Sequence, residues 1–164
     1  MVGAGQHDHP SASLCRRSTQ SKRGQAAQAL GRSKGGFSTK IHLIVDALGN
    51  PLDFVLTGGE RNDVTQAPTL LAGRHSDYVI ADKGYDASSV IEQIESSGAL
   101  PVVPARKNWL IPRYYNKQLY RERHVAECCV NKLKHFRHIF SRFDKLASRY
   151  LGFLEFVAAL IWLR

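Results

Sequence analysis

Two apolar segments joined by a short turn constrain the fold most, in the stretch FSTKIHLIVDALGNPLDFVLT. Residues 37–45 alternate and are rich in β-branched side chains, residues 52–57 are apolar again, and LGNP between them is typical of a turn. This pattern predicts a β-hairpin. The downstream segments then predict a short helix over 62–73, a buried strand ending at Asp82, a helix over 86–98, a strand within 99–108, a helix from Tyr120, and a final helix over 146–163. Such an order is typical of an α/β fold with a mixed sheet flanked by helices.

Charge is unevenly distributed along the 164 residues. Residues 1–40 hold seven Lys or Arg against one acid, residues 41–104 hold three against nine, and residues 105–149 hold twelve against three. An acidic middle between basic flanks suits a protein that binds a polyanion and also gathers carboxylates, as a metal-using nuclease does. A basic protein with solvated charges gives the same totals, so charge alone leaves both interpretations open.

The two ends of the sequence and its cysteines indicate the cellular compartment in which the protein is expected. The start, MVGAGQHDHP, lacks a basic segment followed by an apolar one, and the apolar end, YLGFLEFVAALIWLR, is too short to span a bilayer. Three cysteines form no even framework and no C-x-x-C pair, which fits a reducing compartment. We therefore expect a cytoplasmic, nucleoid-associated protein without a membrane partner. Residues 1–30 are predicted to be a disordered basic segment and residues 31–164 a folded core.

Asp82 follows four apolar residues and precedes Lys83 and Gly84. In an open α/β sheet, ligands bind at the carboxyl ends of the strands, and glycine lets a backbone or ligand approach closely. Asp82 is therefore a candidate ligand for a divalent metal. A strand-end aspartate can instead cap the next turn.

A row of four polar side chains marks the helix that begins at Tyr120. At about 100° per residue, Tyr120, Arg123, Glu127 and Lys134 fall within one stripe about 60° wide. Cysteines 128 and 129 lie among the apolar residues of the opposite side, which we expect to be buried, so this pattern disfavours either of them as a nucleophile. The simpler alternative is a solvated helix face on which Arg123 and Glu127 form an i,i+4 ion pair.

Two carboxylates from different elements predict metal chemistry. Asp82 and Glu127 could hold divalent cations through hard oxygen ligands, and the neighbouring Arg and Lys side chains would contact DNA phosphates. Two-ion catalysis of phosphodiester cleavage needs a further carboxylate. The basic stretch GRSKGG lacks the G-K-[ST] of a Walker site, so Arg32 and Lys34 are better interpreted as DNA contacts.

The spacing of Tyr120, Arg123, Glu127 and Lys134 resembles the Y-R-E-K signature of bacterial insertion-sequence transposases of the DDE superfamily, within the group of insertion sequences four and five. GRSKGGFSTKIHL, ADKGYD and the closing FRHIFSRFDKLASRYLGFLEFVAALIWLR are also similar to that family, and the resemblance covers residues 29–164. It implies an RNase H-like core, two Mg²⁺ ions, cleavage of DNA at the transposon ends and strand transfer into target DNA.

The resemblance also implies roles for individual residues. Asp82 would be the second catalytic acid and Glu127 the third, both as metal ligands. Tyr120, Arg123 and Lys134 would contact DNA, together with Lys83, Arg32 and Lys34. A homodimer is a further implication of the family.

The first acid of the family pattern is missing from its expected strand. Asp8 is the only acid upstream of the glycine-rich stretch, and no strand is predicted within residues 1–36. Permitted codons for the first residues can be read in a shifted frame as W-S-V-L-D-S-T-I-I-R-A-H-P, which resembles the missing strand. We therefore expect a truncated or frameshifted chain without its first core strand, with a structureless start. Its missing part would come from the product of an upstream reading frame.

Two functions follow from these expectations. The first is a transposase catalytic-core fragment that cleaves little DNA alone, because the first acid is missing. The alternative is a non-catalytic basic DNA-binding protein, or a regulator of the full transposase. If the start of the chain is genuine, the third ligand is to be sought among Asp46, Asp63 and Asp86.

Overall fold

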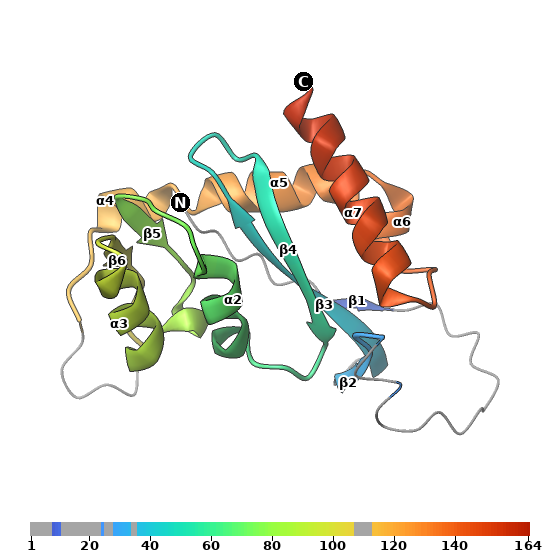
Figure 1. Ribbon diagram of the computed structural model, residues 1–164, viewed down its shortest axis with the longest axis horizontal. Helices are drawn as coiled ribbons and strands as arrows, with labels where there is room; N and C mark the ends of the chain where they lie inside the picture. The colour runs from blue at the N-terminus through green and yellow to red at the C-terminus, as the bar shows by residue number, and fades with distance from the viewer. Residues whose placement is uncertain (1–7, 11–23, 25–27, 34–35, 107–112) are drawn as a thin grey trace.

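The computed structural model describes residues 8–10, 24, 28–33, 36–106 and 113–164. Its strands are β1 (Asp8–Pro10), β2 (Gly31–Ser33), β3 (Gly36–Val45), β4 (Pro51–Gly58), β5 (Tyr78–Ile80) and β6 (Leu100–Val102). Its helices are η1 (Asp63–Gln66), α2 (Ala67–Leu71), η2 (Lys83–Tyr85), α3 (Ser88–Ser96), α4 (Lys117–Arg121), α5 (His124–Lys134), α6 (Arg137–Phe140) and α7 (Ala147–Trp162). The α/β class and the predicted order of elements are confirmed (Figure 1).

The predicted hairpin forms the centre of the fold. β3 and β4 pair antiparallel from Thr39↔Gly58 to Val45↔Pro51. In the turn between them, the Asp46 carboxylate accepts hydrogen bonds from the Leu48 and Asn50 amides, and Gly49 adopts a φ of 85°. That left-handed conformation is accessible to glycine with little strain.

The sheet differs from the single mixed sheet that the sequence predicts. β1, β2, β3 and β4 form an antiparallel sheet, whereas β5 and β6 form a separate parallel pair with α3 as the crossover between them. Among the described residues, packing rather than strand pairing joins the two sheets: Ile44 on β3 shares a core with Val79 on β5. The expectation of one continuous sheet is therefore wrong for the part of the chain that the structure describes.

Two strands lie within residues 1–36, where none was expected. β1 pairs antiparallel with β3, with Asp8 opposite Lys40, and β2 pairs with the same strand from Gly31↔Ser38 to Ser33↔Gly36. Periodicity could not predict these pairings, because the backbone groups of a neighbouring strand pair with any extended segment, whatever its side chains. Asp8 therefore lies in a strand, contrary to expectation.

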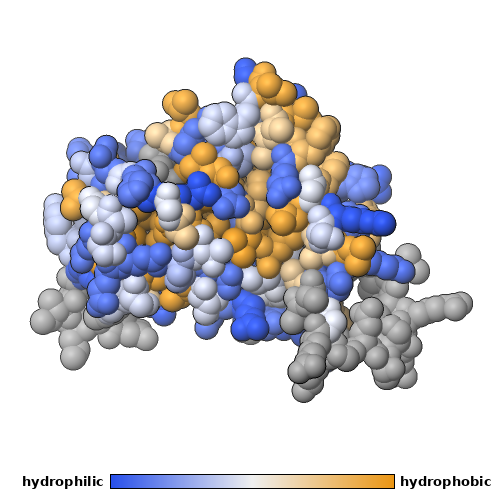
Figure 2. Space-filling view, viewed as in Figure 1, coloured by the Kyte–Doolittle hydropathy of each residue, from blue (hydrophilic) through white to orange (hydrophobic). Residues whose placement is uncertain are grey.

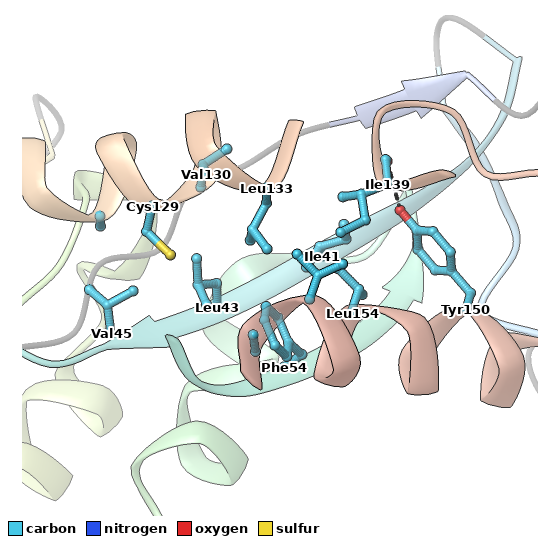
Figure 3. Close-up of a cluster of buried hydrophobic side chains, with 13 residues drawn as sticks. Ile41, Leu43, Val45, Phe54, Cys129, Val130, Leu133, Ile139, Tyr150 and Leu154 are labelled. Carbon is cyan, nitrogen blue, oxygen red and sulfur yellow. Dashed lines mark hydrogen bonds between the residues drawn. The ribbon is translucent and has the colours of Figure 1, made fainter. Parts of the chain in front are cut away.

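Alternate residues of β3 supply two cores. Ile41, Leu43 and Val45 pack with Cys129 of α5 and Leu154 of α7, as Figure 3 shows. On the other face, Ile44 packs against α2, α3 and the β5–β6 pair. Helices α5 and α7 therefore cover one face of the hairpin, while the smaller elements that follow β4 cover the other (Figure 1).

The C-terminal helix was predicted over 146–163 and is observed as α7. Tyr150, Leu154, Val157 and Ala158 form its buried side, and the Tyr150 hydroxyl donates a hydrogen bond to the Ile139 carbonyl at 3.0 Å (Figure 3). In the described parts of the chain, no helix combines the length and apolarity that crossing a membrane would need.

A buried arginine joins the start of the core to its end. The Arg142 side chain donates to the carbonyls of Ala29, Asp144 and Lys145 and to the Thr39 hydroxyl, and it is only 3% exposed. The Gln28 side chain also accepts a hydrogen bond from the Ala147 amide. Residues 28 and 29 therefore contact the folded core, just before the boundary expected at residue 30.

We predict that Arg142→Leu lowers the free energy of unfolding by about 3 kcal/mol, because several buried acceptors lose their donor at once. Chemical denaturation followed by circular dichroism measures the change. Arg61→Leu is the matched control: this arginine is exposed, and its replacement should change stability by less than about 0.5 kcal/mol. Equal effects of the two substitutions would contradict the role assigned to Arg142.

Candidate functional site

Asp82 lies where the sequence predicts it, directly after the buried end of β5. Its side chain is partly exposed and accepts a hydrogen bond from the Lys83 amide at 2.7 Å. The capping interpretation is therefore confirmed, with Asp82 as the N-cap of η2. Because this hydrogen bond uses Oδ1 only, capping leaves Oδ2 available as a ligand atom.

Arg106 holds the turn that follows Asp82. Its guanidinium donates to the Lys83 carbonyl at 3.2 Å and to the Gly84 carbonyl at 2.6 Å, and its backbone amide donates to the Asp86 carboxylate at 2.7 Å. Sequence reasoning did not select Arg106. The signal was its position just after a second buried strand, because the carboxyl ends of neighbouring parallel strands meet at one edge.

The helical row starts on α4 and continues onto α5. Asn116 caps α4 by accepting from the Gln118 and Leu119 amides, and the chain then passes through Glu122 and Arg123 into α5. Hydrogen bonds from Arg123 to Tyr120 and from Val125 to Glu122 span three residues, so this junction is a tight 3₁₀-like turn. The predicted continuous helix is therefore two helices.

Three members of the row contact one another. Arg123 forms an ion pair with Glu127 at 2.7 Å, and its guanidinium lies 5.6 Å from the centroid of the Tyr120 ring. Glu127 lies in the first turn of α5, where the helix dipole favours a negative charge. Lys134 lies in the last turn, two turns farther on, and the described part of the chain provides no ion pair for its ammonium group. The row therefore divides into a cluster of three residues and a separate lysine.

The charges of Asp82 and Glu127 both affect the pKa of Tyr120. Burial raises the pKa of the Tyr120 hydroxyl most, and the carboxylates of Asp82 and Glu127 raise it further, while Arg123 opposes them. The strand-end carboxylate and the helix carboxylate thus lie within electrostatic reach of the same hydroxyl. We name Asp82, Tyr120, Arg123 and Glu127 the junction cluster.

The buried face of α5 differs from the prediction. Ala126, Cys129, Val130 and Leu133 are buried, whereas Cys128 is exposed. The expectation that Cys128 points to the core is therefore wrong. The reason is that α5 packs against β3 through the side that carries Ala126 and Leu133, and Cys128 lies outside that side.

A buried polar group lies behind the turn of Asp82. The Asp63 carboxylate is 3.5 Å from the Lys40 ammonium and 3.5 Å from His42 Nδ1, and both residues belong to β3. His42 also contacts the Thr57 hydroxyl at 2.8 Å. Burial raises the pKa of Asp63, with a contribution from Asp82, although Lys40 opposes both. Sequence reasoning missed Lys40 and His42; the signal was two polar residues inside an apolar strand.

Asp46, Asp63 and Asp86, the alternative candidates for the third metal ligand, have different environments. Slight burial raises the pKa of Asp46, but hydrogen bonds from Asn50 and Leu48 lower it more, so the net shift is downward. Asp86 is buried and accepts the Arg106 amide. Both carboxylates therefore hold loops, whereas the charge of Asp82 contributes to the raised pKa of Asp63.

The site residues offer an incomplete donor set for two metal ions. Asp82 and Glu127 provide hard oxygen ligands of the kind that Mg²⁺ takes. Within the described ranges, however, no three His, Cys, Asp or Glu side chains are grouped so that they could hold one ion. Asp63 does not complete the set, because Lys40 lies against it. The described donors thus fall short of a two-ion site.

The remaining predicted DNA contacts are dispersed. Lys83 is exposed beside Asp82. Arg32 is exposed on β2, which Figure 1 places at the end of the antiparallel sheet far from β5. Lys34 lies outside the described residues. The structure therefore brings Lys83 to the Asp82 turn and does not bring Arg32 there.

Comparison with known proteins decides the family. The model of the transposase DDE domain matches residues 6–160. The chain belongs to the transposase DDE domain family. A relative from Brucella ovis, named as a transposase for insertion sequence element IS6501, is 38% identical over 132 residues, which cover 77% of this chain and 99% of the relative.

A second relative is more distant from this DDE domain. It comes from Burkholderia cepacia and is named as a transposase for insertion sequence element IS402. The identity is 30% over 135 residues, which cover 75% of this chain and 62% of the relative. No solved structure matches the chain.

We predict that this DDE domain loses stability as the pH falls from 6.5 towards 4. Burial, and to a lesser degree Lys40, lower the pKa of His42 from 6.5 to about 4. Between these values the unfolded chain binds a proton that the folded chain does not, so unfolding becomes more favourable, by up to about 3 kcal/mol.

Urea denaturation at a series of pH values measures this loss, and His42→Gln should remove most of it. His75→Gln is the matched control, because His75 is exposed and its replacement should leave the pH dependence unchanged. A His42→Gln variant with the same pH dependence as the unaltered chain would contradict the assignment.

Proposed function

We propose that this DDE domain is the catalytic-core fragment of an insertion-sequence transposase of the Y-R-E-K group, with an RNase H-like arrangement. The observation that carries this proposal is the contact of Arg123 with both Glu127 and the Tyr120 ring, within electrostatic reach of Asp82. Its chemistry would be metal-dependent cleavage and strand transfer at transposon ends. Asp82 and Glu127 would be the catalytic, metal-binding acids.

DNA would bind across the junction cluster. Arg123 can contact a phosphate on the side away from Glu127, since its side chain is 30% exposed. Lys83 and Lys134 would add phosphate contacts at the two ends of the cluster, and Tyr120 would hold Arg123 in place through its ring. Arg32 and Lys34 would contact DNA farther along the duplex.

Cleavage by the chain alone should be weak. The junction cluster contains two carboxylates, and the described residues provide no third acid grouped with them, as two Mg²⁺ ions would require. Asp63 is a further carboxylate within electrostatic reach of Asp82, and its pairing with Lys40 opposes a role as ligand. The chain would therefore bind DNA, as a homodimer or with the product that supplies the missing acid.

The second candidate function is a non-catalytic DNA-binding protein or regulator of the full transposase. The incomplete donor set favours it, since the same basic side chains bind phosphates without any metal. The two functions differ in what Glu127 does. For a binding protein, its loss would change affinity alone.

We predict that the chain binds duplex DNA with a strong salt dependence, and that Arg123→Ala weakens binding to all sequences alike. Removing one phosphate contact should lower the slope of log affinity against log salt by about 1. Fluorescence anisotropy with a duplex carrying a transposon end, at several salt concentrations, measures the slope. Arg164→Ala is the control, because this exposed arginine lies at the far end of α7. A change as large in the control would exclude a specific role for Arg123.

We further predict that Mg²⁺-dependent nicking of a transposon-end duplex by the purified chain barely exceeds that of Asp82→Asn. Asparagine keeps the capping hydrogen bond to Lys83 and removes the charge that a metal needs. Glu127→Gln is the parallel variant. Robust nicking that both substitutions abolish would overturn the proposed inactivity and support full catalysis. Nicking that neither substitution changes would point to a contaminant.

A further inference from the structure

A row of aromatic rings lies on the outward side of α7. Phe156 on this helix is 59% exposed, and Phe143, in the loop before it, is 49% exposed. The ring centroids of Phe143 and His138 are 5.7 Å apart, those of His138 and Phe153 5.3 Å, and those of Phe153 and Phe156 6.4 Å. Figure 2 shows hydrophobic atoms gathered over α7 towards its C-terminal end. We name Phe143, His138, Phe153 and Phe156 the aromatic face.

The rings of the aromatic face do not stack flat on one another. The interplanar angle is 74° between Phe143 and His138, 58° between His138 and Phe153, and 36° between Phe153 and Phe156. An exposed ring whose face is not covered by a parallel neighbour can receive another planar group. Phe156 is the most exposed of the three phenylalanines, so it is the best placed to do this.

Gly152 leaves the helix backbone bare one turn before Phe156. A Cβ built on Gly152 meets no heavy atom within 4 Å, so alanine would fit the fold and would favour the helix. Long side chains on a helix lean towards its N-terminus, so the Phe156 ring lies towards the turn that contains Gly152. A side chain at position 152 would fill the space beside that ring. The glycine keeps this space open for a planar ligand.

Two cations accompany the rings. The guanidinium of Arg137 lies 6.0 Å from the centroid of the Phe143 ring. At about 100° per residue, Arg149 projects within about 40° of both Phe153 and Phe156. Both arginines are exposed. Positive charge is therefore available at the Phe143 end of the aromatic face and beside Phe156.

The acids that adjoin the aromatic face in sequence are turned aside or paired. Glu155 precedes Phe156, but it projects about 100° away from it around the helix. Asp144 follows Phe143, and its charge raises the pKa of the buried Arg142, against the larger effect of burial. The positive charge of Arg142 thus offsets that of Asp144. The surface around the exposed rings is therefore basic rather than neutral.

We propose that the aromatic face, together with Arg137 and Arg149, binds single-stranded DNA, with unpaired bases stacked on the exposed rings and phosphates at the two arginines. Exposed aromatic rings interleaved with cations suit an unpaired strand, because every base has a planar face. Duplex DNA fits less well, since its bases are already stacked and it offers only its backbone and groove edges. A purely apolar partner would cover both arginines without a counter-charge, which costs free energy.

This site goes beyond the proposed function, because it uses none of the junction cluster. Fluorescence anisotropy with a labelled oligothymidine of about 15 nucleotides measures binding, and an abasic strand of equal length supplies the same phosphates without bases. The chain should bind the oligothymidine about tenfold or more tightly than the abasic strand. Phe156→Ala should remove most of this preference while leaving the affinity for duplex DNA unchanged, so the two sites can fail separately.

Leu100→Ala is the matched control for Phe156→Ala. Leu100 is 60% exposed and lies on β6, which Figure 1 places at the opposite end of the molecule from α7. Its replacement should leave the preference for oligothymidine unchanged. Equal binding of the thymidine and abasic strands would overturn the proposal, and so would equal effects of the two substitutions.

Variants on α7 test the other parts of the site. Arg149→Gln should lower the slope of log affinity against log salt for oligothymidine by about 0.7, whereas Glu155→Gln on the other flank should not lower it. Gly152→Leu fills the space beside Phe156, so it should weaken binding although its melting temperature stays the same or rises. Unweakened binding by Gly152→Leu would contradict the role given to the glycine.

Other occupants of the aromatic face give a different result. If Phe156→Ala abolishes binding to phosphatidylglycerol vesicles and leaves the affinity for oligothymidine unchanged, the face binds lipid and the proposal fails. If the substitution changes only self-association in sedimentation velocity, the face contacts a second copy of the chain and the proposal fails as well.

Discussion

The structure depends on β3 being buried on both faces. Every described residue from Ser38 to Val45 is buried, and alternate side chains serve two different cores. An interior strand of this kind must be apolar or must bring partners for its polar groups. Ile41, Leu43 and Val45 are apolar and pack against α5 and α7. On the other face, the polar residues Lys40 and His42 have partners: Lys40 pairs with Asp63, and His42 contacts Thr57 and Tyr85.

The polar side of β3 is connected with the site. The Asp63 carboxylate on η1 pairs with Lys40, and the charge of Asp82 contributes to the raised pKa of Asp63. Asp82, the proposed metal ligand, therefore lies close to an internal ion pair. Burial lowers the pKa of His42 to about 4, so this histidine adds no positive charge to the interior behind Asp82 at neutral pH.

Local signals predicted the elements well and their partners poorly. The hairpin was predictable because residues 37–45 alternate and a turn follows, and Asp82 was predictable because a buried strand ends there. Tyr120, Arg123 and Glu127 were predictable because helical spacing brings them together. The separation into two sheets and the strand at Asp8 were not predictable, because strand pairing depends on contacts between segments that are far apart in the sequence. Arg142 was missed for a related reason: its side chain binds carbonyl groups, which no side-chain pattern reveals.

The division of one core between distant parts of the chain has a kinetic consequence. Ile41 and Val157 belong to the same cluster, although nearly the whole folded chain separates them. During synthesis, the β3–β4 hairpin emerges well before α7, so the part of its apolar face that α7 covers stays exposed until α7 has left the ribosome. Contacts between such remote segments also slow the search for the native state. Packing of α7 against the hairpin, rather than formation of the hairpin itself, is therefore the step that completes this core.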